Sequence, residues 1–513
     1  MIKKINIKVL PEEAQDDSNV VQLALKQAQI KKKDLTDFLI TKKSIDSRRL
    51  PIKIDIAITL YIGEKAPSLY NPVEFKKVNN GNKIIIVGMG PAGLFAALKV
   101  IELGGSPIII ERGEKVEDRR KSVASMILND KINEHSNYCF GEGGAGAFSD
   151  GKLFTRSKKR GNINEVLSLF VQMGAPLSIL NDAHPHLGTD KLPAIIKNMR
   201  NTILENGGEI YFNEKVVDFI QDGSTITGVA TSSGKEFIAP VILATGHSSK
   251  DIYKLLYKKH IPIEAKSIAI GLRVEHSQNF IDSVQYKSKK GRGKYLPPAE
   301  YRLVSKVNDR GVFSFCMCPG GSIVPSQTEN GYSLVNGMSS SSRGGKWANS
   351  AIVTEIRVED VDKDNNPLSM LEFQEEIEKR TFDLTSTDLT VPAQRVSDFI
   401  NRVESKDLPK SSYLGKIVSK DLNQIFPKEV AKCLRGGFIS FNKKIPGFSS
   451  ANSLVIASET RTSSPVRIIR DKETFMSNDG LFPCGEGAGY AGGIVSSALD
   501  GINCAIAVIR YLS

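Results

Sequence analysis

A strand–turn–helix–strand pattern over residues 83–112 constrains the fold more than any other feature of the chain. The segment reads KIIIVGMGPAGLFAALKVIELGGSPIIIER. Its first half predicts a buried strand of β-branched residues that runs directly into the turn GMGPAG. Its second half predicts a helix and then a second buried strand that ends at Glu111. This order and spacing are typical of a βαβ unit that binds a dinucleotide.

Each residue type in this unit has a physical reason. Gly88 can adopt a backbone conformation that a side chain forbids, Gly90 lets the chain approach a pyrophosphate, and Gly93 lets the helix pack close to the strand. The N-terminus of the helix offers free N–H groups to the phosphates. The Glu111 carboxylate can accept hydrogen bonds from the ribose hydroxyls of an adenosine and would repel a 2′-phosphate. The unit alone fits FAD and NAD equally.

A second glycine-rich segment, FGEGGAGAFSDGKL, spans residues 140–153. Its four closely spaced glycines, among them Gly143 and Gly144, exceed what a turn requires. They favour contact between bare backbone and a large planar ligand or its phosphates, and Asp150 and Lys152 would add polar contacts.

Two further segments are expected to reach the same nucleotide. Residues 206–249 predict a three-stranded meander with hairpin turns at DGS and SSGK, then an apolar strand that ends in ATG at Ala244, Thr245 and Gly246. Val216, at the start of the meander, could pair its backbone with an adenine edge. Residues 480–512 predict a strand that ends near Gly485 and a long helix that begins near GGI at 492–494, with its positive end toward an electron-rich group.

These segments together resemble the glutathione-reductase-type FAD-binding fold. Five segments have sequences similar to those of a bacterial family of uncharacterised FAD-utilising dehydrogenases. They are GEGGAGAFSDGKL, GLRVEHSQ, FSFCMCPGG, NGMSSSSRGGKWANSAIV and RTSSPVRIIRD. The C-terminal segment LFPCGEGAGYAGGI favours FAD over NAD, because NAD-only Rossmann domains lack it.

The resemblance implies non-covalent FAD, with Glu486 at the ribityl chain or pyrophosphate and backbone N–H groups of Gly493 and Ile494 at the flavin ring. Many relatives have Asp at the position of Glu486, so the side chain here reaches one methylene further. The full predicted cofactor set is Gly88, Gly90, Pro91, Ala92, Gly93, Glu111, Arg112, Gly143, Gly144, Lys152, Val216, Ala244, Thr245, Gly246, Gly485, Glu486, Gly492, Gly493 and Ile494.

The expected fold class is α/β: a Rossmann-like FAD-binding domain with an inserted β-rich substrate domain and a small N-terminal α+β domain. In the N-terminal domain, the segment around residues 33–46 predicts either a second helix or a helix–turn–strand. The expected boundaries are 1–78 for the N-terminal domain, 79–160, 195–260 and 475–513 for the FAD-binding domain, and 161–194 and 261–474 for the substrate domain.

Composition narrows the class further. With 40% hydrophobic and 25% charged residues, the 513-residue chain is typical of a globular protein, and the start of the chain has no signal peptide pattern. We therefore predict a cytoplasmic protein without a membrane span. The net charge of +12 permits a nucleic-acid partner, but no RNA-binding or zinc-finger motif accompanies it, and a solvated lysine-rich surface is the preferred interpretation.

The cysteines and histidines have no disulfide or zinc spacing, so we predict free thiols and no metal. Cys316 and Cys318 would share one face of a strand, which makes a redox pair conceivable. It is not the preferred interpretation, because disulfide reductases of this fold space their cysteines more widely. His184 and His186 could share a face, but no third metal ligand accompanies them.

The predicted function is transfer of a hydride between FAD and an unidentified small-molecule substrate. Guanidinium groups suit carboxylates and phosphates, and the candidate substrate contacts are Arg273, Arg343, Arg461 and Arg467. No second nucleotide fingerprint follows, so electrons would come from the substrate, a transiently bound NAD(P)H or a redox partner. The alternative is an RNA-associated flavoprotein that binds nucleic acid through its basic N-terminal domain. The sequence indicates no catalytic residue.

Overall fold

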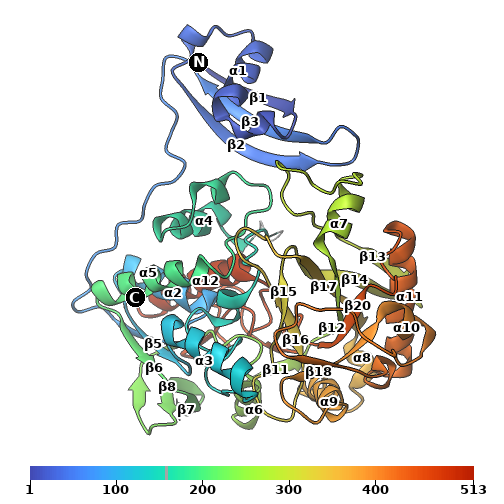
Figure 1. The fold of residues 1–513 in the computed structure, drawn as a ribbon. Helices are drawn as coiled ribbons and strands as arrows, with labels where there is room; N and C mark the ends of the chain where they lie inside the picture. Colours follow the sequence, from blue (N-terminus) through green and yellow to red (C-terminus); the bar gives the residue numbers. More distant parts are fainter. Residues whose placement is uncertain (156–159) are drawn as a thin grey trace.

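The computed structural model describes residues 1–155 and 160–513. Residues 156–159, which fall within the expected range 79–160, lie outside the described residues. Three sheets define the architecture: a small one near the N-terminus, a parallel one, and a large mixed one (Figure 1).

The N-terminal unit is a three-stranded antiparallel sheet with one helix packed on it. Strands β1 (Ile2–Val9), β3 (Lys53–Tyr61) and β2 (Asp37–Asp46) lie in the order β1-β3-β2, and α1 (Asp17–Ala28) covers one face. Alternate residues of β3, Ile54, Ile56 and Ile58, are buried, as the period of two requires. Of the two predictions for residues 33–46, the second matches: a single 3₁₀ turn (Lys32–Asp34) precedes β2.

The dinucleotide fingerprint forms the centre of a five-stranded sheet in the order β22-β10-β4-β5-β6, with every pair parallel. Its strands are β4 (Lys83–Val87), β5 (Ser106–Glu111), β6 (Glu209–Phe212), β10 (Val241–Leu243) and β22 (Leu481–Pro483). Helix α2 (Pro91–Glu102) follows the glycine turn, as predicted. Because the strands are parallel, the glycine turn, Glu111, the ATG segment and the C-terminal motif meet at one edge of the sheet.

The meander after β6 consists of β7 (Val216–Asp222), β8 (Thr225–Thr231) and β9 (Glu236–Ile238). It forms a separate antiparallel sheet and returns the chain to β10, as the sequence pattern predicts.

The third sheet has seven strands in the order β13-β14-β17-β12-β20-β18-β19, antiparallel except for β18 and β19. These are β12 (Ile268–Ser277), β13 (Val304–Val307), β14 (Arg310–Cys318), β17 (Trp347–Ile356), β18 (Thr390–Arg395), β19 (Lys416–Ser419) and β20 (Leu454–Glu459). Helix α11 (Lys428–Lys444) packs on it through Phe438 and Phe441, in a core that includes Ile270 and Ile352.

Shorter elements connect these layers. The helices are α3 (Val116–Asn129), α4 (Ile163–Gln172), α5 (Leu192–Glu205), α6 (Lys250–Lys258), α7 (Gln278–Gln285), α8 (Val358–Val361), α9 (Ser369–Asp383) and α10 (Val396–Asn401). Strands β11 (Ile263–Ala265) and β21 (Val466–Ile468) pair, as do β15 (Ser322–Pro325) and β16 (Val335–Met338). Helix α4, expected in the substrate domain, packs against α2 through Phe170 and Phe95, whose ring centroids are 5.2 Å apart.

The C-terminal helix α12 (Ile494–Tyr511) is long and apolar enough to cross a membrane by length and composition. In the structure, 67% of it is buried inside the protein, where it packs along α2. Its apolar character is therefore explained by the core that it helps to form (Figure 1).

Candidate functional site

A cavity of about 390 Å³ extends from the carboxyl edge of the parallel sheet to the mixed sheet. Sixteen of the predicted cofactor residues line it: Gly88, Gly90, Pro91, Ala92, Glu111, Arg112, Gly144, Lys152, Val216, Ala244, Thr245, Gly246, Glu486, Gly492, Gly493 and Ile494. The mixed sheet contributes Phe315 and Cys316, the loop after β20 contributes Arg461 and Thr462, and the strand β16 of a separate two-stranded sheet contributes Asn336. Segments far apart in the sequence thus share one site.

The three fingerprint glycines differ in what surrounds them. A Cβ on Gly93 would lie 2.0 Å from the Gly88 carbonyl oxygen, so Gly93 permits the close helix–strand packing that the sequence predicts. Gly88 has a φ of +99°, and a Cβ there would lie 2.6 Å from the Ala244 carbonyl oxygen. Among the described residues outside its chain neighbours, a Cβ on Gly90 would meet the Gly144 Cα alone, at 3.9 Å. The free space beside Gly90 therefore belongs to the cavity.

Two other predicted glycines lie behind the lining. Gly143 and Gly485 have φ values of +85° and +76°, and added Cβ atoms would lie 2.5 Å from Ile196 Cδ1 and 2.8 Å from Ala92 Cβ. Their requirement for glycine follows from the backbone and from neighbouring side chains, without any ligand.

Glu111 is only 4% exposed and organises the turn beneath the cavity. Its carboxylate accepts hydrogen bonds from the backbone N–H groups of Met89 (2.8 Å), Gly113 (2.9 Å) and Gly141 (3.1 Å). It thereby ties the first glycine-rich turn to the second. A carboxylate has about four acceptor positions, so a ribose hydroxyl could still be bound.

Arg112 is held beside Glu111 by two contacts. It forms an ion pair with Asp251 of α6, and its guanidinium lies 4.3 Å from the centre of the Phe140 ring. Both Arg112 and Phe140 line the cavity, so this ion pair fixes part of its wall.

The lining leaves room and polar atoms for a dinucleotide. Added Cβ atoms on Gly246, Gly492 and Gly493 would meet no atom within 4 Å among the described residues other than their chain neighbours. His247 also lines the cavity, and its buried Nδ1 has no hydrogen-bond partner among the residues that the structure describes. Glycine backbone without side chains in the cavity lining, together with this ring nitrogen of His247, fits a large polar ligand.

Glu486 and His247 face each other across the cavity wall, with 3.9 Å between His247 Nε2 and Glu486 Oε1. Burial raises the pKa of Glu486 to about 7, and the charge of Lys266 opposes this shift. Burial lowers the pKa of His247 to about 4, with the charges of Arg461 and Lys266 adding to the effect. Near neutral pH, Glu486 is the group in this pair that titrates.

This raised pKa predicts a pH-dependent effect of Glu486→Gln. The folded state binds the Glu486 proton more firmly than the unfolded state, whose pKa is near 4.5, so the Glu486 contribution to stability falls as pH rises from 4.5 to 7. Glutamine lacks this titration. Between pH 4.5 and pH 8, the free energy of unfolding of the FAD-free variant should therefore rise by about 1–3 kcal/mol relative to that of the FAD-free parent.

Urea denaturation at the two pH values measures this difference. Glu473→Gln changes an exposed glutamate and is the control. An equal stability difference between Glu486→Gln and the parent at both pH values would contradict the assigned titration.

Near the mixed sheet, a charged cluster borders the cavity. Lys152 Nζ lies 3.1 Å from Asp150 Oδ2 and donates a hydrogen bond to the Met317 carbonyl of β14. Asp150 also forms an ion pair with Arg343 and accepts a hydrogen bond from Ser339. The second glycine-rich segment is therefore attached to β14 by side chains that line the site.

The four candidate arginines take different positions. Arg461 lines the cavity and pairs with Glu378 at 2.9 Å. Arg273, fully buried, pairs with Glu459 at 2.7 Å. Arg343 pairs with Asp150, and Arg467 pairs with Glu264 at 2.9 Å. Of these, the cavity lining includes Arg461 alone among the described residues.

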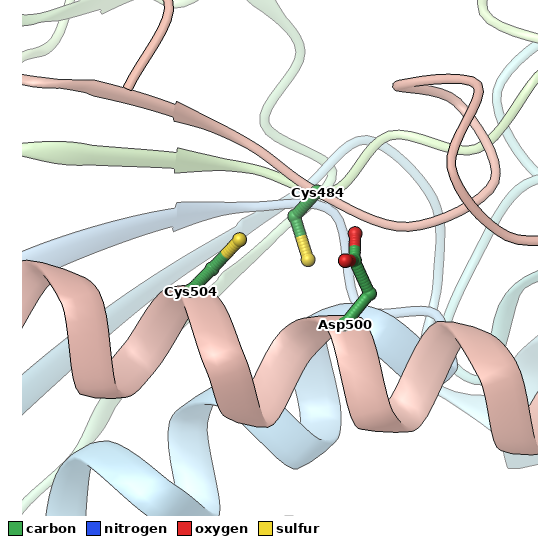
Figure 2. A group of neighbouring side chains, drawn as sticks. All are labelled: Cys484, Asp500 and Cys504. Carbon is green, nitrogen blue, oxygen red and sulfur yellow. The ribbon is translucent and has the colours of Figure 1, made fainter. Parts of the chain in front are cut away.

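One buried group of two cysteines and an aspartate was not predicted from the sequence. The Sγ atoms of Cys484 and Cys504 and a carboxylate oxygen of Asp500 lie within 4.8 Å of one another beneath the end of β22 (Figure 2). Arg470 supplies the positive charge here: its guanidinium is 2.6 Å from Asp500 and 3.5 Å from Cys504 Sγ. Asp500 also accepts the Gly485 N–H at 2.7 Å, so the cluster fixes the C-terminal glycine turn.

Comparison with known proteins supports the cofactor assignment. Residues 267–462 match the family model described as "FAD-dependent protein, C-terminal domain-like", and residues 1–61 match a domain of unknown function, DUF8436. An uncharacterized protein of Clostridium beijerinckii is 38% identical over 517 residues, covering 96% of each chain. The matched domain description and the cavity agree, and FAD is the cofactor of this chain.

Solved structures resemble the chain more distantly. The flavin-dependent brominase Bmp2 is 14% identical, with 84% of this chain and 80% of that chain covered and a TM-score of 0.36. CtdE in complex with FAD is 12% identical, with 84% of each chain covered and a TM-score of 0.31. Structural similarity at TM-scores this low assigns neither a domain arrangement nor a reaction to this chain.

Proposed function

Since the chain belongs to one family with the uncharacterized protein of Clostridium beijerinckii, we propose that it is an FAD-dependent oxidoreductase that transfers a hydride between a small-molecule substrate and FAD. The observation that carries the proposal is the continuity of the cavity. It runs from the fingerprint turn to Phe315, Asn336 and Arg461 of the mixed-sheet region. A pure nucleotide site would end at the parallel sheet, whereas an enzyme needs space where a substrate meets the cofactor.

Each wall of the cavity has a task in this proposal. The N–H groups at the start of α2 bind the pyrophosphate, and Glu111 holds the adenosine ribose. The N-terminus of α12 stabilises negative charge on the flavin ring. FAD supplies the hydride chemistry when bound, and the chain binds and orients it. Arg461 is the proposed contact for an anionic substrate group.

We further propose the glutathione-reductase-type arrangement and the dehydrogenase class. Strands from 79–160, 195–260 and 475–513 share the parallel sheet, which supports assigning these ranges to one FAD-binding domain. The seven-stranded sheet comes from 261–474, which supports a separate substrate domain there. A cytoplasmic location and reduction by the substrate, transiently bound NAD(P)H or a redox partner belong to the same proposal.

Anaerobic titration of the FAD-loaded protein tests the proposed reaction. NADH, NADPH and fractions of a metabolite pool are added in turn while the flavin absorbance is followed. We expect one of them to bleach the flavin with saturation. An FAD-loaded protein whose flavin responds to none of them, and is reoxidised by none after chemical reduction, would contradict the oxidoreductase assignment.

The helix N-terminus gives a prediction for the flavin potential. Gly493 has an extended φ of 162° and open space around it, so Gly493→Asp introduces a carboxylate without backbone strain. That charge opposes the α12 dipole and disfavours reduced, anionic flavin. A helix N-terminus contributes roughly 0.3–2 kcal/mol to an adjacent anion, and for a two-electron couple ~1.4 kcal/mol corresponds to ~30 mV. The midpoint potential should fall by tens of millivolts, as measured by dye-equilibrated reductive titration.

Gly493→Asn is the matched control, because it has the same size without the charge. A midpoint that is unchanged or higher in a fully FAD-loaded Gly493→Asp protein would show that α12 does not face the flavin ring.

A further inference from the structure

Two cysteines at the end of β14 lie where the strand is irregular. The pairing of β14 with β17 shifts register between Phe315 and Cys318, which marks a bulge. Cys316 within it has a φ of +45°, in the left-handed region that residues with side chains seldom adopt. Residues held in such conformations are enriched at functional sites.

The bulge gives the two thiols different surroundings. Cys316 lines the FAD cavity, whereas Cys318 is fully buried behind it. The Cys318 Sγ lies 3.4 Å from the Cys316 carbonyl oxygen, so its side chain turns back toward its neighbour. The Cys316 thiol can thus meet a ligand in the cavity, whereas the Cys318 thiol lies beside the Cys316 backbone and outside the cavity lining.

Cations surround this short segment. Lys152 donates a hydrogen bond to the Met317 carbonyl, between the two cysteines, and Arg273 Nη1 lies 3.4 Å from the Cys316 carbonyl oxygen. A hydrogen bond from the Cys318 thiol, with the charges of Lys152 and Arg273, lowers the pKa of Cys316 below the usual value of a thiol. The hydrogen bond to Cys316, together with burial, raises the pKa of Cys318. Of the two thiols, the one that lines the cavity is therefore the one that loses its proton first.

We propose that Cys316 and Cys318 form a dithiol–disulfide couple that exchanges two electrons with FAD. The Cys316 thiolate and the Cys318 thiol form one S–S bond and give up two electrons and the Cys318 proton. FAD takes up these two electrons and the proton and becomes the reduced anionic flavin, so charge and atoms balance. In the reverse direction, reduced flavin opens the disulfide. This inference rests on the binding of FAD in the cavity described above.

Electron counting on the holoprotein tests the couple. Diamide first oxidises neighbouring thiols and is removed, the FAD content is measured, and dithionite is then added anaerobically. The parent protein should take up two electrons for the flavin and two for the disulfide. Cys316→Ser and Cys318→Ser should take up half as much per FAD. Cys318→Ala provides a second variant should serine in this buried position disturb folding.

Alkylation followed by peptide mass analysis identifies which cysteines are reduced. Cys316 and Cys318 should become alkylatable on dithionite addition to the FAD-loaded parent and stay blocked in the FAD-free parent, because the electrons pass through the flavin. Cys433→Ser, which removes a buried cysteine of α11 outside the cavity lining, should behave as the parent.

Uptake by the FAD-loaded parent equal to that of the variants, or equal alkylation with and without FAD, would overturn the inference. A folded protein that binds no FAD would contradict the proposed function and the inference together.

Discussion

Gly90→Val is expected to abolish retention of FAD while the chain stays folded. The Gly90 backbone is extended, with φ −79° and ψ −172°, so valine adopts it without strain. Apart from its chain neighbours, the nearest described atom to a Cβ there is the Gly144 Cα, at 3.9 Å, and the space that valine fills is the cavity in front of the α2 N-terminus. We expect FAD affinity to fall at least about a hundredfold, or ~2.7 kcal/mol, as measured by calorimetric titration of the FAD-free protein.

Two other glycines provide controls for this experiment. Gly311→Val, in β14, places the same side chain in equal free space outside the cavity lining and should leave FAD binding unchanged. Gly93→Ala forces a Cβ to within 2.0 Å of a carbonyl oxygen and should lower folding stability and FAD content together. Full FAD occupancy in a folded Gly90→Val protein would show that the pyrophosphate lies elsewhere.

Glu111→Ala is expected to produce two separable losses. Three buried N–H groups lose their acceptor, so the FAD-free protein should become less stable by at least about 1–3 kcal/mol, the scale for unsatisfied buried groups. The ribose also loses a charged acceptor, which should weaken FAD binding by about 1–3 kcal/mol, or roughly 5- to 150-fold. Denaturation of the FAD-free protein measures the first loss, and titration with FAD measures the second.

Glu111→Gln refines this result, because it keeps one oxygen for the backbone N–H groups and removes the charge. If Glu111→Ala lowers stability but FAD affinity of the folded protein stays at the parent value, Glu111 holds the glycine turns and does not bind the ribose.

The sequence predicts the parallel-sheet edge well because its signals are local. In the segment 83–112, the turn requires glycine for its own geometry, and the apolar strands are short and continuous. Gly246 could be expected at this site because it follows a predicted strand, and the carboxyl ends of parallel strands converge. Val216 and Gly493 could be expected there because each stands at the start of a predicted element.

Features of the mixed sheet depend on long-range pairing and could not be predicted. Arg273 pairs with Glu459, which lies 186 residues later, so a guanidinium proposed for substrate binding is already neutralised in the core. The segment around Cys316 reads as an ordinary strand, because a bulge is decided by the register of the neighbouring strand.

His247 could have been found from the sequence. It directly follows the ATG segment, whose end was expected to approach the ligand, and polar residues just beyond the carboxyl end of a parallel strand commonly line a site in α/β sheets.

Identification of the released flavin tests the central claim most directly. The purified protein is denatured in acid, and the supernatant is separated by chromatography against FAD and FMN standards, with the flavin-to-protein ratio measured. The adenosine side of the cavity, with Glu111 and Val216, predicts intact FAD in a ratio near one per chain, released without a covalent remnant on the protein. Recovery of FMN, or of no flavin after incubation of the folded protein with excess FAD, would contradict the assignment of this cavity to FAD.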